Sequence, residues 1–341
     1  MAQQSYLQWL VRETPTTWWH DSGEPGELAI GLEQLASGVT TNPVLSARAL
    51  ATKPAGWLKE IEALDGNLPP ERLAEERVRI VVTHCAHELE PAYERTEGAE
   101  GYVCAQVNPS KAGDREVMLS MARRFASFAP NIAVKLPVTA AGLDVLEDCI
   151  AEGITITATV SFTVPQVLAV AERYRAGIAR AREAGVTPGH CFSVIMIGRL
   201  DDYLRDVAHD QGASVSEQDI RWAGLAVTKR AYAIYQERGY EAKLLIAAQR
   251  GTYHITELAG SEMIMSIHPK TQTLLFQPGV PRELGIDNPV PGDVVARLET
   301  IPDFRRAYEP DGMTPEEFIT YGATQRTLTQ FAEIGWNVLE S

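Results

Sequence analysis

The sequence lacks several features that would point to whole classes of protein. Its 341 residues contain no apolar run approaching the ~20 residues of a membrane span. The protein has a net charge of -14, so it lacks the excess of basic residues that a nucleic-acid-binding surface needs. No GxGxxG or P-loop pattern supports nucleotide binding, and the first residues lack the basic-then-apolar build of a secretion signal. We therefore expect a cytoplasmic protein with neither a membrane nor nucleic acid as partner.

Cysteine is also scarce, and the few cysteines form no recognisable metal or disulfide pattern. Cys85, Cys104, Cys149 and Cys191 are widely spaced, form no CxxC pair and lie in apolar segments, so buried reduced thiols are expected. His84 and His87 lie beside Cys85 with a spacing that could suit a metal, but no fourth ligand is apparent. The sequence predicts neither a metal nor a cofactor.

What is present is a regular alternation of short branched or apolar runs with segments of helical periodicity. The expected strands are Thr16–Asp21, Gly38–Asn42, Tyr102–Val107, Ile132–Leu136, Ile154–Val160, His190–Ile197, Lys243–Ala248 and Glu262–His268. The expected helices are Glu27–Ala36, Glu71–Glu88, Arg115–Phe128, Gly142–Glu152, Pro165–Ala184, Glu217–Arg238 and Tyr253–Ala259. Such strand–helix units favour an α/β fold, a single (β/α)8 TIM barrel, over an open sheet.

The ends of this pattern define the expected domain organisation. Residues 1–275 are expected to form the barrel, and residues 276–341 a C-terminal extension that packs on it. Residues 199–215 look like an excursion after the sixth strand. A last helix is expected from about Glu316 to Leu339, on the outside of the barrel.

Lys135 is the most informative residue, because it is a cation inside an apolar strand. Side chains alternate between the faces of a strand, so Ile132, Val134 and Leu136 form one hydrophobic face. Ala133 and Lys135 share the other face, which would point into a barrel. A partly desolvated amine there could attack a carbonyl as a nucleophile. The alternative is a strand-end lysine whose ammonium group reaches water or a carboxylate.

Polar residues occur at equivalent positions near the ends of the other strands. They are Asp21, Thr40, Asn42, Gln106, Thr157 and Thr159, and Arg199 and Arg250 follow the sixth and seventh strands. In a parallel barrel these strand ends meet at one rim, where the chemistry of such folds takes place. Each residue also has a structural explanation: Asp21 could cap the helix near Gly26, and Arg199 could pair with Asp201 or Asp202.

Several segments resemble the transaldolase family, which includes the fructose-6-phosphate aldolases. Gly38–Pro43 resembles the second-strand signature of that family, and Val134–Leu143 resembles its Schiff-base strand and following turn. Gly198–Asp202 and Ala247–Arg250 resemble the family's segments at the sixth and seventh strands. The resemblance covers roughly residues 16–275.

The resemblance implies a role for each of these residues. Lys135 would form a Schiff base with a ketose, and Asp21 would be the acid and base for carbon–carbon cleavage. Thr40 and Asn42 would hold substrate hydroxyls, and Arg199 and Arg250 would bind the substrate phosphate. Gln106 and Thr159 would contribute to catalysis around a water molecule. Thr157 and Met196 would contact the substrate. The partners would be small sugar phosphates, and a homo-oligomer remains open.

Four positions depart from the family pattern. Gln106 stands where transaldolases usually have Glu and is typical of the aldolase branch, Met196 stands where Phe or Tyr is usual, and Val194 and Ala248 replace Ser. The leading hypothesis is a transaldolase that transfers a dihydroxyacetone unit between sugar phosphates. The alternatives are a fructose-6-phosphate-type aldolase that releases dihydroxyacetone, and a non-catalytic barrel that binds sugar phosphates.

Overall fold

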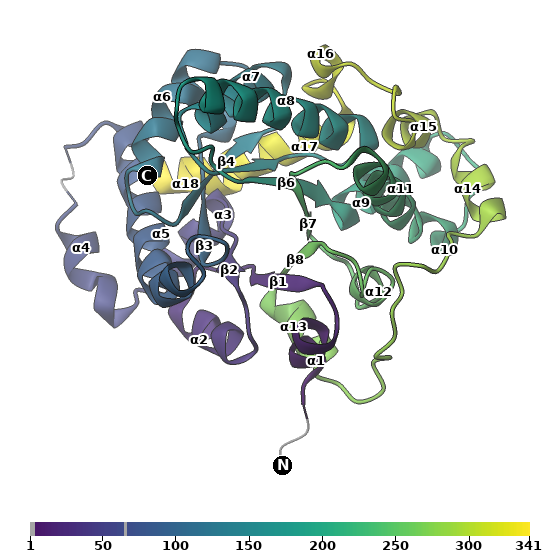
Figure 1. Cartoon of the computed structure of the whole chain (residues 1–341), viewed down its shortest axis with the longest axis horizontal. Helices are drawn as coiled ribbons and strands as arrows, with labels where there is room; N and C mark the ends of the chain where they lie inside the picture. The colour runs from purple at the N-terminus through teal and green to yellow at the C-terminus, as the bar shows by residue number, and fades with distance from the viewer. Residues whose placement is uncertain (1–3, 65–66) are drawn as a thin grey trace.

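The computed structural model describes residues 4–64 and 67–341, and its centre is a closed barrel of eight parallel strands (Figure 1). The strands are β1 (Thr17–His20), β2 (Gly38–Val39), β3 (Tyr102–Gln106), β4 (Ile132–Pro137), β5 (Ile156–Thr159), β6 (Cys191–Met196), β7 (Lys243–Ala247) and β8 (Ile264–Ile267). Their order around the barrel follows the chain, and β8 pairs with β1 to close it. The (β/α)8 barrel prediction is therefore confirmed.

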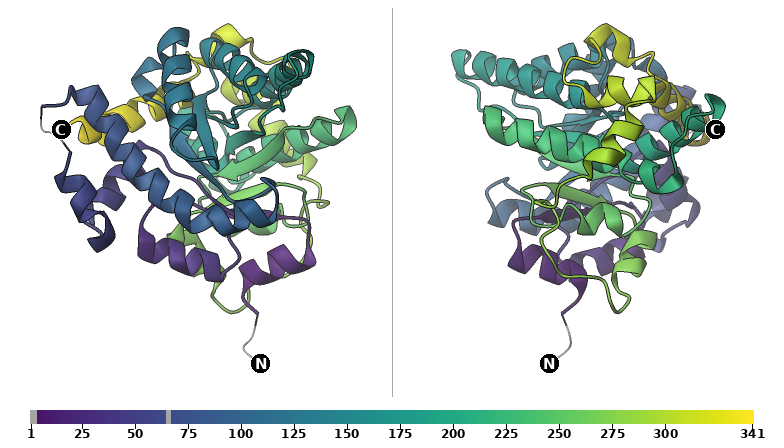
Figure 2. Two further views of the ribbon diagram at one scale, coloured as in Figure 1. Left: turned by 60° about the vertical axis from the view of Figure 1, so that its left-hand side comes forward. Right: turned by 90° about the vertical axis from the view of Figure 1, so that its right-hand side faces the viewer.

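Helices follow each strand and surround the barrel, as both views in Figure 2 show. They are α2 (Pro25–Glu33) after β1; α3 (Pro43–Ala51), η1 (Ala55–Trp57), α4 (Leu58–Glu62) and α5 (Pro70–Arg95) after β2; η2 (Pro109–Lys111) and α6 (Arg115–Ala126) after β3; α7 (Ala140–Ala151) after β4; α8 (Val164–Glu183) after β5; α9 (Ile197–Asp210), α10 (Glu217–Ile220) and α11 (Ala223–Arg238) after β6; α12 (Tyr253–Thr256) after β7; and α13 (Pro269–Leu275) after β8. A short helix, α1 (Tyr6–Glu13), precedes the barrel.

Most of residues 199–215, expected as an excursion after the sixth strand, forms the helix α9. Its buried residues include Ile197, Leu200, Leu204 and Ala208, spaced three and four residues apart as in an amphipathic helix. The charged pair Asp201 and Asp202 obscured this apolar spacing in the sequence. One of the two, Asp201, is fully buried with the apolar residues.

The expected last helix, Glu316 to Leu339, is divided into several pieces. The C-terminal extension contains α14 (Gly292–Leu298), α15 (Pro302–Tyr308), α16 (Pro315–Phe318), α17 (Gly322–Phe331), the π-helical segment η3 (Ala332–Trp336) and α18 (Asn337–Glu340). Gly322 lies so close to the Tyr203 ring that a Cβ there would come within 2.5 Å of it. Tertiary contacts, which helical periodicity does not encode, therefore fix where these helices begin.

The extension packs on the helices outside the barrel, as expected, and it also reaches the carboxyl ends of the strands. The segment η3 packs against α3, and α18 packs along α5, so the C-terminus lies beside α5 in Figure 1. Gln330, Phe331 and Ile334 line the same cavity as Lys135. The end of the chain therefore contributes to the site described below.

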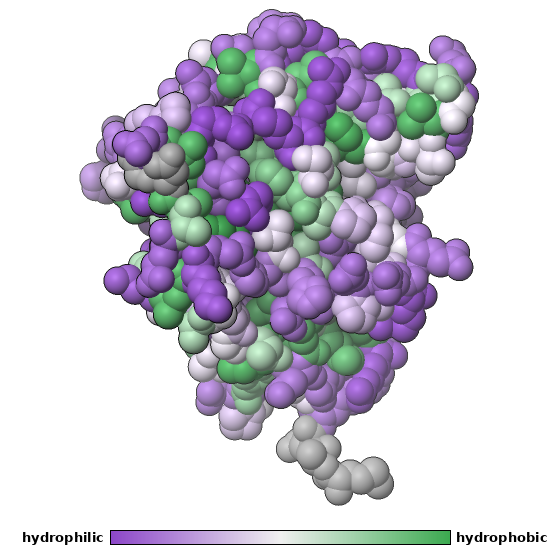
Figure 3. Space-filling view, turned by 90° about the vertical axis from the view of Figure 1, so that its left-hand side faces the viewer, coloured by the Kyte–Doolittle hydropathy of each residue, from purple (hydrophilic) through white to green (hydrophobic). Residues whose placement is uncertain are grey.

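The barrel interior and the layer between strands and helices form the hydrophobic core. Trp19 meets Phe192 edge-on inside the barrel, with ring centroids 4.6 Å apart. All four cysteines are buried and free, as expected, and burial raises the pKa of Cys85 to about 12. On the face shown in Figure 3, hydrophilic residues predominate and hydrophobic ones are interspersed. Among the described helices, none is both long and apolar enough to cross a membrane.

Candidate active site

A cavity of about 360 Å³ opens at the carboxyl ends of the strands. Predicted site residues that line it are Asp21, Thr40, Asn42, Lys135, Met196, Arg199 and Arg250. The apolar side chains of β6 and β7 form one wall, and the C-terminal extension closes part of the mouth. The cavity has a size typical of sites for small molecules.

Lys135 points into the barrel, as the alternation of the strand predicts. Its side chain is 6% exposed, and its Nζ donates to the carbonyl oxygen of Thr41 at 3.0 Å. Gln106 on β3 and Thr157 on β5 are its register partners, so all three side chains belong to one inward-facing layer. The hydrogen-bond partner of the amine is thus a neutral carbonyl rather than a carboxylate.

Asp21 follows β1 and faces the same cavity. Its Oδ1 accepts a hydrogen bond of 2.7 Å from Thr40 Oγ1. Since the Thr40 hydroxyl has one hydrogen, the Ser266 hydroxyl of β8 is the donor in its contact with Thr40. Asp21 does not cap α2, because the Glu24 side chain accepts from the first turn of that helix. The carboxylate is thereby held in place over the cavity.

Asn42 combines a structural contact with a place in the cavity wall. Its Oδ1 accepts from the backbone N–H groups of Val44 and Leu45 at 3.0 and 3.1 Å, which caps the N-terminus of α3. The cap engages the oxygen of the amide and leaves the Nδ2 hydrogens for another acceptor. Asn42 can therefore donate to a substrate hydroxyl while it fixes the loop after β2.

Gln106, Thr157 and Thr159 are buried close to Lys135 in the strand register but are not part of the cavity wall. Thr157 Oγ1 contacts Cys104 Sγ at 3.3 Å. Within the described part of the chain, Gln106 Oε1 and Thr159 Oγ1 have no hydrogen-bond partner. Buried polar atoms normally have one, so a water molecule or a ligand hydroxyl would suit both positions.

The backbone after Thr159 is strained and is held by a buried glutamine. Val160 has φ of +55°, a conformation that is costly for a β-branched residue. Gln166 Nε2 donates to the Val160 carbonyl at 3.3 Å, and its Oε1 accepts from the backbone N–H of Phe162 at 2.9 Å. The chain therefore turns sharply at the end of β5, directly after a candidate catalytic residue.

Arg199 lies at the start of α9, where the C-terminal extension covers it. Its guanidinium lies over the Phe331 ring, 5.0 Å from the centroid, and donates to the Gln330 side chain. Burial, together with the charge of Arg250, lowers the pKa of Arg199 to about 10. The expected pairing of Arg199 with Asp201 or Asp202 is not what the structure shows.

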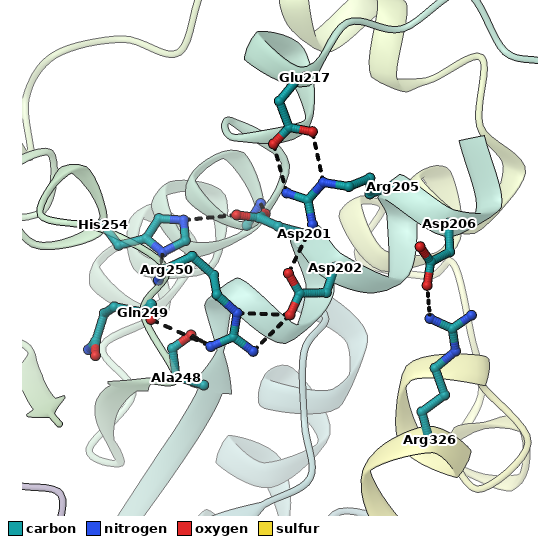
Figure 4. A network of polar contacts seen from close by, with 11 residues as sticks. Asp201, Asp202, Arg205, Asp206, Glu217, Ala248, Gln249, Arg250, His254 and Arg326 are labelled. Atoms are coloured by element: carbon teal, nitrogen blue, oxygen red, sulfur yellow. Dashed lines mark hydrogen bonds and ion pairs between the residues drawn. The ribbon is translucent and has the colours of Figure 1, made fainter. Parts of the chain in front are cut away.

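Arg250 is the arginine that pairs with Asp202 (Figure 4). Its Nε lies 2.8 Å from Asp202 Oδ2, and one terminal nitrogen donates to the Ala248 carbonyl at 3.0 Å. The other oxygen of Asp202 accepts from Arg205 at 2.9 Å. A Cβ on Gly198 would lie 2.5 Å from the Arg250 stem, so a glycine is needed for this close packing. Asp202 thus fixes the arginine at the cavity edge.

A second acidic residue of α9 fixes the backbone at the same place. His254 Nδ1 accepts from the backbone N–H of Arg250 at 3.2 Å, so its hydrogen is on Nε2. This Nε2 lies 2.9 Å from Asp201 Oδ2 (Figure 4). Asp201 Oδ1 accepts from the Gly224 N–H at 2.8 Å. Asp201 and His254 are fully buried. The contacts of Asp201 and His254 therefore connect α9, α11 and α12 and fix the backbone position of Arg250.

The sequence did not single out several residues that line this cavity. Ser266 is one small hydroxyl in an apolar strand, and Arg48 and Lys270 lie in helices after β2 and β8. Parity along β8 could have revealed Ser266, because it faces the same way as Trp19, its register partner. Gln330, Phe331 and Ile334 of the C-terminal extension had no such pattern in the sequence, because only the fold brings them to the mouth of the cavity.

The two histidines weighed as metal ligands point to different partners. His84 stacks on Trp57 and contacts Glu60 at 2.7 Å, whereas His87 is 81% exposed beside Glu90. In the part of the chain that the structure describes, no three His, Cys, Asp or Glu side chains are grouped as metal ligands. These contacts are those of ordinary helix-surface residues.

Fold and site together define a (β/α)8 barrel with an amine and a carboxylate facing one cavity at the carboxyl ends of its strands. The sequence model of the Transaldolase/Fructose-6-phosphate aldolase family matches residues 18–305. The chain belongs to this family, as the resemblance predicted. The match extends beyond residue 275, into the C-terminal extension.

Proteins named transaldolase are similar to the chain over much of its length. The one from Thermobifida fusca strain YX is 31% identical over 230 residues, 63% of this chain and 59% of that protein. The one from Neisseria gonorrhoeae is 28% identical over 319 residues, 91% of this chain and 81% of that protein. The one from Mycolicibacterium paratuberculosis is 27% identical over 307 residues, 80% and 77% of the two chains. The chain thus spans about three fifths of the Thermobifida protein.

Proposed function

We propose that this enzyme is a transaldolase that moves a dihydroxyacetone unit between sugar phosphates through an imine on Lys135. The placement of Lys135 supports this function most strongly, because its buried amine lines the same cavity as the Asp21 carboxylate. Membership of the family and the relatives named transaldolase support the same activity. The aldolase and the non-catalytic barrel remain the competing functions.

The chemistry requires an electron sink and a proton acceptor. The Lys135 amine attacks the C2 ketone of a ketose, and loss of water leaves an iminium. Asp21 takes the proton of the C4 hydroxyl as the C3–C4 bond breaks, and the bonding electron pair moves through C3 to the iminium nitrogen. C4 becomes the carbonyl carbon of an aldehyde product, which leaves the site. The enamine that results attacks an acceptor aldehyde, to which Asp21 returns the proton. Hydrolysis then releases the new ketose.

The charges around the cavity favour an anionic substrate. The lining contains five cationic side chains and one carboxylate, although the whole protein has a net charge of -14. Such a local excess attracts anions and raises their rate of association. Arginine forks suit a phosphate group in particular. A sugar phosphate fits this distribution better than a neutral sugar does.

The direct test of the proposed activity is a transfer reaction with defined substrates. Incubation with fructose 6-phosphate and erythrose 4-phosphate should yield sedoheptulose 7-phosphate and glyceraldehyde 3-phosphate, measured by mass spectrometry. Release of dihydroxyacetone at the same rate with and without the acceptor would instead assign the aldolase function. Absence of both products would favour the non-catalytic barrel.

Replacement of Arg250 should separate phosphate binding from the chemistry. We expect Arg250→Ala to weaken the binding of phosphorylated substrates by about 1.5–3 kcal/mol or less, because one charge-assisted hydrogen bond is lost at a position that is 38% exposed. Free dihydroxyacetone should be affected far less, and Asp202 keeps Arg205 as a partner in the variant. Kinetics with both donors test this, with Arg326→Ala as control. Equal losses for both donors would show that Arg250 acts structurally.

Gln106 should control the partition between transfer and cleavage. An amide can hold a water molecule but cannot take its proton, whereas a carboxylate can. We therefore expect Gln106→Glu to raise transfer to erythrose 4-phosphate relative to release of dihydroxyacetone. Both products are measured in one reaction, with and without acceptor. An unchanged ratio with both activities reduced would mean that Gln106 only fills the barrel interior.

A further inference from the structure

Two basic side chains line the cavity without a part in the steps above. Arg48 belongs to α3, which follows β2, and Lys270 belongs to α13, which follows β8. Because β2 and β8 both pair with β1, the two helices flank the strand that leads to Asp21. Arg199 and Arg250 follow β6 and β7 instead. The cationic groups of the cavity are thus divided between two places on its rim.

The two groups differ in how far protein partners satisfy them. Arg250 pairs with Asp202 through two nitrogens, and Arg199 is held by Gln330 and Phe331. Within residues 4–64 and 67–341, Arg48 has no ion pair, and neither does the Lys270 side chain. Both are exposed at the mouth of the cavity. A cation without a counter-ion gains more from an incoming anion than one already paired.

We propose that Arg48 and Lys270 form a second anion-binding subsite, so that the preferred ligand carries a phosphate or carboxylate in addition to the phosphate near Arg199 and Arg250. This inference rests on the proposed sugar-phosphate function and specifies its substrate class. Asp21 is the one carboxylate in the lining, and Thr40 engages one of its oxygens. The charge on this side of the cavity therefore remains positive overall when Asp21 is ionised.

Ligands without a ketone or aldehyde group cannot form an imine, so they separate this binding from the imine chemistry. Glucitol 6-phosphate carries one anionic group, glucitol 1,6-bisphosphate carries two phosphates, and 6-phosphogluconate carries a phosphate and a carboxylate. Titration calorimetry should show that the protein binds the bisphosphate or the phosphogluconate roughly tenfold more tightly than the monophosphate, since two exposed charge contacts are added. Whichever of the two is preferred identifies the second group.

Variants assign that preference to particular residues. The double variant Arg48→Ala/Lys270→Ala should lose the roughly tenfold preference and bind glucitol 6-phosphate as the unmodified protein does. Arg12→Ala removes an exposed cation from α1, which precedes the barrel, and should keep the preference. Added salt should reduce the preference in the unmodified protein, because exposed charges are screened.

Two results would overturn the second subsite. One is equal affinity for all three ligands in the unmodified protein, and the other is a preference that survives in the double variant. Borohydride trapping of fructose 6-phosphate on Lys135 reports separately on the proposed function. A preference that depends on Arg48 and Lys270, without any adduct on Lys135, would keep the subsite and reject the imine chemistry.

Discussion

Replacement of Lys135 by methionine should lower kcat for transfer by about 10⁴-fold or more, as is typical when a covalent nucleophile is removed. Methionine has nearly the length of lysine but no amine, so no iminium can accept the electrons of the C3–C4 bond. The buried position should tolerate an apolar side chain, apart from the lost hydrogen bond to the Thr41 carbonyl. Stopped assays with fructose 6-phosphate and erythrose 4-phosphate measure the effect.

A matched variant and a folding measurement make that result interpretable. Lys59→Met changes an exposed lysine on α4 and should leave kcat within about twofold, because surface substitutions have small effects. Circular dichroism and thermal unfolding of Lys135→Met should show a folded barrel. Transfer activity of Lys135→Met close to that of Lys59→Met would mean that another group performs the reaction.

Removal of Asp201 should destabilise the protein far more than removal of a neighbouring aspartate on the same helix. Asp201→Ala leaves the Gly224 N–H without its acceptor and removes the carboxylate that lies 2.9 Å from His254 Nε2, in a fully buried place. A buried donor that loses its acceptor costs about 1–3 kcal/mol, and the contact with His254 is lost in addition. Asp206→Ala breaks an ion pair with Arg326 in which both side chains are more than half exposed, and should cost about 1 kcal/mol or less.

Urea unfolding of the two variants, followed by tryptophan fluorescence, gives the comparison directly. Figure 4 shows both aspartates on one helix, so helix propensity changes equally in the two variants. We also expect Asp201→Ala to raise KM for phosphorylated donors, because His254 would no longer be held against the backbone of Arg250. Equal stability of the two variants would show that the buried pair contributes little.

The order of strands and the direction of Lys135 were predictable from the sequence because both depend on local patterns. Alternation along Ile132–Leu136 put the lysine on the inner face, and parallel pairing then placed Asp21, Thr40 and Arg199 at the same rim. The strand β2 (Gly38–Val39) is shorter than the expected Gly38–Asn42, and Asn42 caps α3 instead of belonging to the strand. Local pattern therefore fixed the position of the candidate nucleophile but not every boundary.

The partners of the arginines were not predictable, because they depend on contacts between distant parts of the chain. Arg250 meets Asp202, which is 48 residues earlier, and Arg199 meets Gln330, which is 131 residues later. The sequence suggested the nearby pairing of Arg199 with its own helix, since spacing was the available guide. Two aspartates near the start of α9, Asp201 and Asp202, instead contact His254 and Arg250, which follow β7.

Chemical trapping on Lys135 tests the central claim most directly. Incubation with fructose 6-phosphate followed by sodium borohydride reduces an imine to a stable secondary amine, and peptide mass spectrometry locates it. We predict one adduct, on the peptide that contains Lys135, carrying the mass of the reduced dihydroxyacetone or hexose phosphate unit. Lys135→Met should show none. Labelling of a different lysine, or equal labelling of the Lys135→Met variant, would contradict the assignment of Lys135 as the Schiff-base residue.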